Sequence, residues 1–116
     1  MIRYASVCDG ISAVSVAWKP LGWDCAWVSE IDQFACAVLA ERWPDHHNVG
    51  DLLAIDERIR NRGPIDLLVG GTPCQSFSVA GLRGGLDDAR GNLALRFCQL
   101  AGVLRPRWIV WENVPG

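Results

Sequence analysis

The sequence predicts an α/β fold with a doubly wound, mostly parallel sheet. Short apolar runs alternate with segments of helical periodicity along the chain, a pattern typical of parallel strands joined by helical crossovers. The run "IDLLVGG" at 65–71 is almost entirely apolar, as in strands that are buried on both faces. Half of the 116 residues are hydrophobic, which is enough for one domain with its own core.

The apolar runs predict five strands, and helical segments connect them. The strands fall at residues 2–8, 25–30, 48–52, 65–71 and 107–113, and the helical segments at 12–22, 33–43, 53–61 and 92–104. Pro20 should interrupt the first helical segment and Pro44 should end the second, because proline lacks the amide hydrogen that a helix needs. Asp32 is placed to cap the second helix. A long glycine-rich loop spans residues 70–91.

Composition and charge restrict the class of protein. The net charge is −2, with 11 basic and 13 acidic residues, whereas a module that binds nucleic acid alone usually has a basic excess. No apolar stretch reaches the roughly 20 residues of a membrane span, and the N-terminus lacks the apolar region of a signal peptide. The five cysteines are odd in number and include no C-x-x-C pair, so we expect reduced thiols and no metal site. These features predict a soluble, cytoplasmic protein.

Chemically useful residues follow the predicted strands, at the edge where a doubly wound sheet binds its ligands. They are a glycine turn, three carboxylates and a thiol, namely Gly10, Glu30, Asp51, Cys74 and Glu112. Because the carboxyl ends of parallel strands meet at one edge of the sheet, we expect these residues to share a rim. Their convergence predicts a ligand site there.

Gly10 and Glu30 fit the pattern of a nucleotide site. Gly10 lies between the first strand and the first helix, where glycine lets the backbone turn tightly towards a ligand. Glu30 lies 20 positions later, where nucleotide-binding folds place a carboxylate against ribose hydroxyls. An ordinary turn glycine and a solvated glutamate are the alternatives. Asp51 either accepts a hydrogen bond from an adenine amino group or caps the next helix, and the residues alone favour capping.

Cys74 lies in "GGTPCQSFS", directly after an apolar strand. A cysteine kept for packing prefers the interior of an element, whereas this one follows a stiff proline in a glycine loop. Backbone N–H groups and nearby arginines would favour the thiolate, which is the nucleophilic form. Glu112 ends the neighbouring strand, so it could face the same pocket as a general acid. The alternatives are a small buried thiol and a glutamate paired with an arginine.

In this order the motifs resemble those of the cytosine-C5 DNA methyltransferase family. "GGTPCQSFS" is similar to the family's nucleophile loop, and "RGNL" and "WENV" are similar to its next two motifs. "SEID" and "VGDL" stand where the family holds the ribose and adenine of S-adenosylmethionine. "CDGISAVSVAW" resembles the first motif, with Ser12 and Ala13 in place of the family's paired glycines.

The resemblance implies a Rossmann-like, S-adenosylmethionine-dependent methyltransferase fold and a mechanism. In that mechanism the thiolate of Cys74 attacks C6 of a cytosine flipped out of DNA, and Glu112 contacts and protonates N3. C5 then takes the methyl group from S-adenosylmethionine, a base removes the C5 proton, and the cysteine leaves. The resemblance assigns the cofactor to Cys8, Gly10, Ile11, Glu30, Ile31, Asp51, Leu52, Pro73, Asn92 and Leu93, and DNA contacts to Gln75, Ser76 and Ser78.

Enzymes of this family continue beyond the strand that carries the glutamate, with an arginine motif and a target-recognition domain. The resemblance therefore implies that residues 1–116 are the N-terminal part of a methyltransferase catalytic domain, with a sheet truncated after the fifth strand. We expect DNA binding to need the missing half, the chain alone to be inactive, and the uncovered sheet edge to favour homo-oligomers. The alternatives are a tRNA cytosine-C5 methyltransferase, a nicotinamide or flavin protein, and a non-catalytic remnant that packs on another chain.

Overall fold

The described sheet has four parallel strands in the order β2-β1-β3-β4. The structure is a computed structural model that describes residues 1–71 and 89–112, of which residues 89–92 are described by their backbone alone. The strands are β1 (Arg3–Val7), β2 (Asp24–Ser29), β3 (Leu67–Gly70) and β4 (Trp108–Trp111). The helices are α1 (Ala13–Trp18), α2 (Gln33–Arg42), α3 (Asp56–Ile59) and α4 (Ala89–Leu104), with short 3₁₀ turns η1 (Lys19–Leu21) and η2 (Leu52–Ala54).

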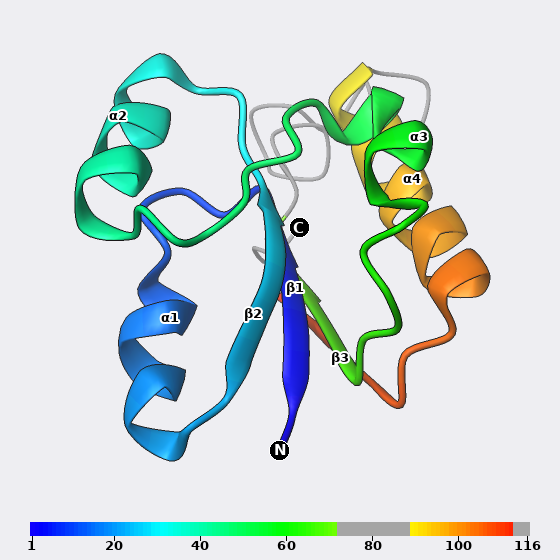
Figure 1. The fold of residues 1–116 in the computed structure, drawn as a ribbon. Helices are drawn as coiled ribbons and strands as arrows, with labels where there is room; N and C mark the ends of the chain where they lie inside the picture. Colours follow the sequence, from blue (N-terminus) through cyan, green and yellow to red (C-terminus); the bar gives the residue numbers. More distant parts are fainter. Residues whose placement is uncertain (72–88, 113–116) are drawn as a thin grey trace.

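Helices cover both faces of this sheet. α1 and α2 lie on one face, and α3 and α4 lie on the other (Figure 1). Side chains of β1 alternate between the two faces: Tyr4 packs against Trp18 of α1 with ring centroids 4.8 Å apart, whereas Ala5 and Val7 join a core cluster that includes Phe97 of α4. This packing confirms the doubly wound α/β class that the sequence predicts.

The expected strand at residues 48–52 is wrong. In the structure this segment makes one isolated bridge, between Asn48 and Val28, and then leaves the edge of β2. Gly50 has a φ of +86°, a left-handed conformation that interrupts an extended strand. Asp51 then caps η2, since its carboxylate accepts a backbone hydrogen bond at 2.9 Å. Local side-chain hydrogen bonds of Asn48 and Asp51 compete here with sheet pairing.

The start and stop signals of the first two helices are confirmed. Pro20 follows the end of α1 and lies in the first turn of η1. Asp32 caps α2, and its carboxylate accepts a hydrogen bond from a backbone N–H at 2.9 Å. The expected helix at 53–61 instead divides into η2 and α3 on either side of Ile55, which is fully buried. Within the described ranges no helix is long and apolar enough to cross a membrane.

Gly70 ends β3, and its lack of a side chain is required by packing. A Cβ built at this position would overlap Val7 and would lie 2.8 Å from the ring of Phe97. A Cβ on the next residue, Gly71, would lie 3.0 Å from the Oε2 atom of Glu112. The glycine pair therefore lets β3, which is buried along its whole length, approach its neighbours closely at the start of the motif "GGTPCQSFS".

β4 lies at an edge of the described sheet and presents large apolar side chains to solvent. Trp108 is 58% exposed, Ile109 53% and Val110 45%, so the described residues cover this strand only in part, with Trp111 stacked on Phe97 of α4. An exposed apolar edge strand also offers unpaired backbone groups for pairing with another chain. We predict that the 116-residue chain self-associates through β4 at micromolar concentration.

Light scattering tests this prediction. Ile109→Lys places a charge on the edge strand and should shift the chain towards the monomer. Val103→Lys is the matched control, because Val103 is 70% exposed on α4, and it should leave the oligomer unchanged. A clean monomer for the unsubstituted chain would contradict the prediction.

Candidate active site

Glu30 and the Gly10 turn meet at the carboxyl-terminal edge of the sheet. Oε1 of Glu30 accepts a hydrogen bond from the N–H of Gly10 at 2.6 Å. Oε2 accepts hydrogen bonds from the N–H groups of Ile31 and Asp32 at 3.0 and 2.9 Å. A carboxylate offers about four acceptor positions, so these bonds orient Glu30 and leave capacity for a ligand hydroxyl.

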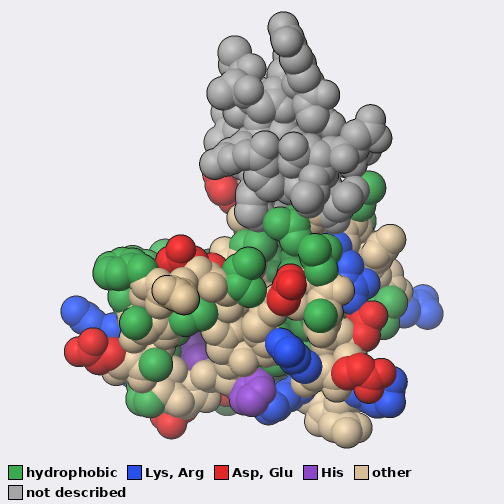
Figure 2. All heavy atoms as spheres, turned by 90° about the horizontal axis from the view of Figure 1, so that it is seen from above, with side chains coloured by type: hydrophobic (Ala, Val, Ile, Leu, Met, Phe, Trp, Pro, Cys, Tyr) green, Lys and Arg blue, Asp and Glu red, His purple; other side chains and the backbone are tan. Residues whose placement is uncertain are grey.

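A cavity of about 250 Å³, termed the rim cavity, opens beside Glu30. Figure 2 looks onto this side of the molecule and shows hydrophobic side chains near its middle, with acidic and basic side chains beside them. The rim cavity is lined by six of the residues that the resemblance assigns to the cofactor: Cys8, Glu30, Ile31, Asp51, Leu52 and Leu93. Its remaining lining residues had no individual role assigned, although each lies within one of the quoted motifs "SEID", "VGDL" and "GGTPCQSFS": Ser29, Gly50 and Gly71.

The lining of the rim cavity fits the adenosine part of S-adenosylmethionine. Ile31, Leu52 and Leu93 offer apolar surface to the faces of a purine ring. Glu30 and Asp51 offer carboxylate acceptors to ribose hydroxyls and to an amino group. Apolar walls with a few directed polar groups are typical of a small-molecule site.

Gly10 is required for its backbone conformation rather than for space. Its φ is +62°, and a Cβ built there would meet nothing within 4 Å. This left-handed conformation, which glycine adopts without strain, accompanies the hydrogen bond from its N–H to Glu30. The next predicted cofactor residue, Ile11, is 56% exposed and does not line the rim cavity.

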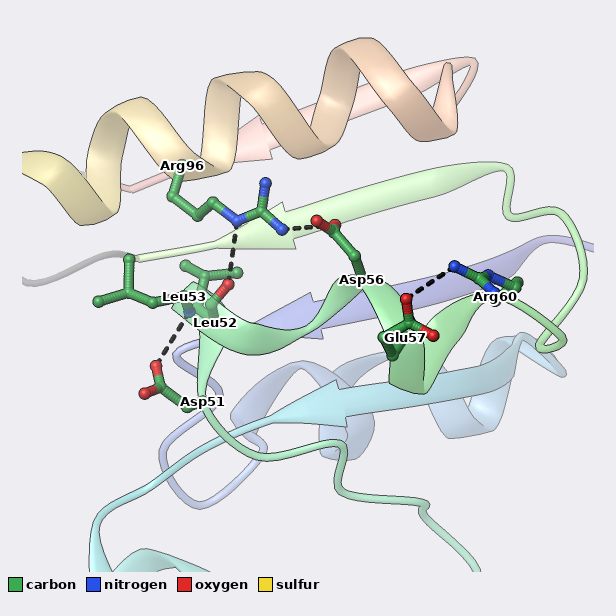
Figure 3. A network of polar contacts seen from close by, with 7 residues as sticks. All are labelled: Asp51, Leu52, Leu53, Asp56, Glu57, Arg60 and Arg96. Atoms are coloured by element: carbon green, nitrogen blue, oxygen red, sulfur yellow. Dashed lines mark hydrogen bonds and ion pairs between the residues drawn. The ribbon is translucent and has the colours of Figure 1, made fainter.

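Arg96 of α4 braces the wall of the rim cavity that carries Asp51 and Leu52 (Figure 3). Its Nε donates a hydrogen bond to the carbonyl of Leu52 at 3.1 Å, and its Nη2 pairs with Asp56 at 2.5 Å. Asp51 caps η2, as the residues alone favoured, and also lines the cavity. Arg96 thus ties this wall to the helix that carries Leu93, a link that no sequence motif indicated.

A second cavity, of about 230 Å³, contains Glu112 and is termed the Glu112 cavity. It lies at the ends of β1, β3 and β4, and it shares Cys8 and Gly71 with the rim cavity. The N–H of Glu112 donates a hydrogen bond to the carbonyl of Gly70 at 3.0 Å. Among the described residues no arginine forms an ion pair with Glu112. The two cavities therefore place a candidate cofactor site and a candidate catalytic carboxylate side by side.

Asp9 adds a second carboxyl group to the Glu112 cavity, although the sequence analysis assigned it no role. Burial raises its pKa, while a hydrogen bond from Ser6 to Oδ1, at 2.5 Å, opposes this rise. Its Oδ2 is buried and has no hydrogen-bond partner within the described part of the chain. The signals in the sequence were its position with Gly10 at the end of the first predicted strand and its place within "CDGISAVSVAW".

The remaining predicted site residues cannot be placed in the two cavities. Those that lie outside the described residues are Pro73, Cys74, Gln75, Ser76 and Ser78, together with the side chain of Asn92. Their roles stay predictions from the sequence. The described chain reaches Gly71, which lines both cavities and precedes Cys74 closely in the sequence.

The described cysteines are all free thiols, namely Cys8, Cys25, Cys36 and Cys98. Burial raises the pKa of Cys8 to about 11 and the pKa of Cys25 to about 12. Since the thiolate is the reactive form, these two thiols are chemically quiet at neutral pH.

We predict that limited alkylation labels Cys74 first. Raising the pKa of Cys8 from 9.0 to about 11 lowers its thiolate fraction about a hundredfold at pH 8. Cys8 and Cys25 should therefore react slowly at pH 8 and faster only as the pH approaches their raised pKa values. Treatment with iodoacetamide followed by peptide mapping measures the order of labelling. Labelling of Cys8, or of the exposed Cys98, before Cys74 would contradict the prediction.

The sequence profile of the C-5 cytosine-specific DNA methylase family matches residues 2–116. The chain belongs to this family. A DNA N-6-adenine-methyltransferase of Escherichia phage P1 is 52% identical over 125 residues, and the orphan methyltransferase M.Rho11sI of Bacillus phage rho11s is 39% identical over 121 residues. The fold also matches a solved structure described as a DNA modification methyltransferase encoded within a prophage of E. coli, with a TM-score of 0.79 and 31% identity. These findings confirm the resemblance and the methyltransferase fold.

The matches cover nearly all of this chain and a minor part of each relative. The phage P1 match spans 97% of this chain and 16% of the relative. The phage rho11s match spans 99% of this chain and 23% of that relative. The prophage structure matches all of this chain over 33% of its own length. The family consists of DNA methyltransferases, which generally use S-adenosylmethionine.

Proposed function

We propose that the chain carries the cofactor site and the nucleophile loop of a DNA cytosine-5 methyltransferase. The observation that carries this proposal is that the rim cavity and the Glu112 cavity share Cys8 and Gly71. Gly71 immediately precedes the motif "TPCQSFS" in the sequence. A cofactor on one side and a glutamate on the other would enclose the reacting atoms. Family membership supports the same reaction.

The residues of the rim cavity would hold S-adenosylmethionine, which supplies an electrophilic methyl group when bound. Glu30 would accept a hydrogen bond from a ribose hydroxyl, and Asp51 would accept one from the adenine amino group. The apolar side chains of Ile31, Leu52 and Leu93 would pack against the purine ring. The further proposed cofactor contacts are Cys8, Gly10, Ile11, Pro73 and Asn92.

Carbon C5 of cytosine is a weak nucleophile, so the proposed reaction needs residues that activate the ring. The thiolate of Cys74 forms a bond to C6, and the displaced electron pair is delocalised towards N3, where Glu112 donates a proton. C5 would then take the methyl group as its bond to the sulfonium sulfur breaks, so that S-adenosylhomocysteine leaves and the N3 proton returns to Glu112. A base would remove the C5 proton, and elimination of the thiolate would restore the ring. The thiol reaches C6 only when the base is flipped out of the helical stack.

The proposed grip on DNA depends on a further segment. The net charge of the chain is −2, whereas contacts between cationic side chains and phosphates supply most non-specific DNA affinity. Gln75, Ser76 and Ser78 are proposed DNA contacts that would act close to Cys74. We predict no measurable methyl transfer by the 116-residue chain alone, and transfer once the remaining part of a longer relative is added as a separate polypeptide. Activity of the chain alone would contradict this prediction.

Methylation of adenine N6 is the second candidate, because the phage P1 relative is named for it. The matched stretch is 16% of that relative, so the name describes a much longer protein. The exocyclic amine of adenine attacks a methyl group directly, so its methylation requires no thiol nucleophile. The Pro-Cys loop is instead suited to attack on a ring carbon, and it therefore favours cytosine.

The product of the reaction tests the proposal. Labelled S-adenosylmethionine is incubated with the complemented chain and either unmethylated duplex DNA or tRNA, and the nucleic acid is digested to nucleosides. We expect label in 5-methylcytosine from DNA. Label in N6-methyladenine would overturn the cytosine assignment, and label in tRNA alone would identify an RNA-directed member of the family.

A further inference from the structure

Asn48 lies between the end of β2 and the turn at Gly50, and its side-chain amide makes four hydrogen bonds. Its Oδ1 accepts from the N–H groups of Glu30 at 3.1 Å and Gly50 at 2.9 Å. Its Nδ2 donates to the carbonyl of Glu30 at 3.1 Å and to the Sγ of Cys36 at 3.4 Å. An amide has two donor hydrogens and an oxygen with two acceptor positions, so the hydrogen-bonding capacity of Asn48 is fully used.

These bonds join two walls of the rim cavity. One wall carries Glu30, whose carboxylate holds the Gly10 turn. The other wall is the segment Gly50–Asp51, which has left the sheet and is not spaced by regular strand pairing. Ser29 adds one further link, since its Oγ donates to the carbonyl of Gly50 at 2.6 Å. Backbone bonds of Val28 with His47 and Val49 hold the preceding residues against β2, and the amide of Asn48 continues this connection to the two walls themselves.

We propose that Asn48 is a positioning residue that sets the spacing of Glu30 and Asp51 and so the affinity for the adenosine part of S-adenosylmethionine. This inference deepens the proposed function and rests on it. Asn48 does not line the rim cavity, although it lines an adjoining cavity of about 640 Å³ that shares Glu30 and Asp51 with it. Because its amide is fully used by protein groups, it acts through Glu30 and the Gly50 turn. Aspartate has the same shape and keeps the acceptor oxygen for Glu30 and Gly50, but it loses both donor hydrogens and so the bond to the carbonyl of Glu30. Leucine has a similar volume but no polar group, so it removes every bond of residue 48 to the two walls.

Calorimetric binding of S-adenosylhomocysteine to the 116-residue chain tests the inference. Asn48→Asp removes both donors, and we expect the affinity to fall roughly tenfold, about 1.4 kcal/mol. Asn61→Asp is the matched control, because Asn61 is exposed in the turn before Gly63. This substitution introduces the same charge away from the cavity. It should bind as the unsubstituted chain does.

A double-mutant cycle with Glu30→Gln separates positioning from a general loss of stability. If Asn48 acts through Glu30, the double variant should lose clearly less affinity than the sum of the single losses. A merely structural role would lower the melting temperature and leave the binding losses additive. Asn48→Leu, which carries no charge, replaces Asn48→Asp if the latter does not fold. In the Asn48→Leu variant the Gly50 amide should exchange its hydrogen faster, since the side-chain oxygen that accepts from it is gone.

The outcomes distinguish this inference from the function on which it rests. Unchanged affinity in a folded Asn48 variant, or additive losses in the cycle, would overturn the positioning role and leave the cofactor site in place. No binding of S-adenosylhomocysteine by the unsubstituted chain would overturn the proposed cofactor site, and the positioning role with it.

Discussion

Cys74→Ser should reduce methyl transfer to DNA by roughly a thousandfold or more. A serine hydroxyl stays protonated at neutral pH and is a far weaker nucleophile than a thiolate, so C6 is not attacked and C5 stays unreactive. The measurement is transfer of label from S-adenosylmethionine to unmethylated duplex DNA by the complemented chain.

Cys98→Ser is the matched control for this substitution. Cys98 is exposed on α4 and lines neither the rim cavity nor the Glu112 cavity, so its replacement should leave the rate unchanged. S-adenosylhomocysteine should bind equally well to both variants, because neither change alters the adenosine site. A Cys74→Ser variant that keeps more than about a tenth of the rate would show that the thiol is not the nucleophile.

Glu30→Ala should weaken binding of S-adenosylhomocysteine by roughly ten- to a hundredfold, about 1.4–2.7 kcal/mol. The substitution removes the proposed ribose acceptor. It also leaves the N–H groups of Gly10, Ile31 and Asp32 without the carboxylate that accepts from them, so the turn that shapes the site is no longer held. Calorimetry on the 116-residue chain measures the change.

Glu41→Ala removes the same group from the exposed face of α2 and serves as the control for Glu30→Ala. It should bind S-adenosylhomocysteine with unchanged affinity. Thermal melts of both variants exclude unfolding as the cause of any loss. Equal affinity of the Glu30→Ala variant and the unsubstituted chain would remove Glu30 from the cofactor site.

The strand ends were the most predictable part of the site. Gly10 and Glu30 are 20 positions apart in the sequence and in direct contact in the structure, because neighbouring parallel strands bring their carboxyl ends to one edge. The same rule explains why Glu112 lies next to Gly70 and Gly71. Position along a strand is thus enough to place such residues on a common rim.

The segment between α2 and η2 was the least predictable part. Its short apolar run indicates a strand, but the side chains of Asn48 and Asp51 bond to nearby backbone groups, and Gly50 turns the chain away. Such local hydrogen bonds compete with sheet pairing. The segment 48–52 is too short for its hydrophobic pattern to indicate which of the two forms.

The sequence by itself determined the fold class, four of the five expected strands and the residues at their ends, because alternating apolar runs, prolines and capping residues act locally. The tertiary structure alone decided which groups those residues contact. Three backbone N–H groups orient Glu30, the amide of Asn48 joins Glu30 to Gly50, and Arg96 reaches a carbonyl 44 positions away at Leu52. These contacts depend on where the packed core places distant segments, and no local pattern encodes that placement.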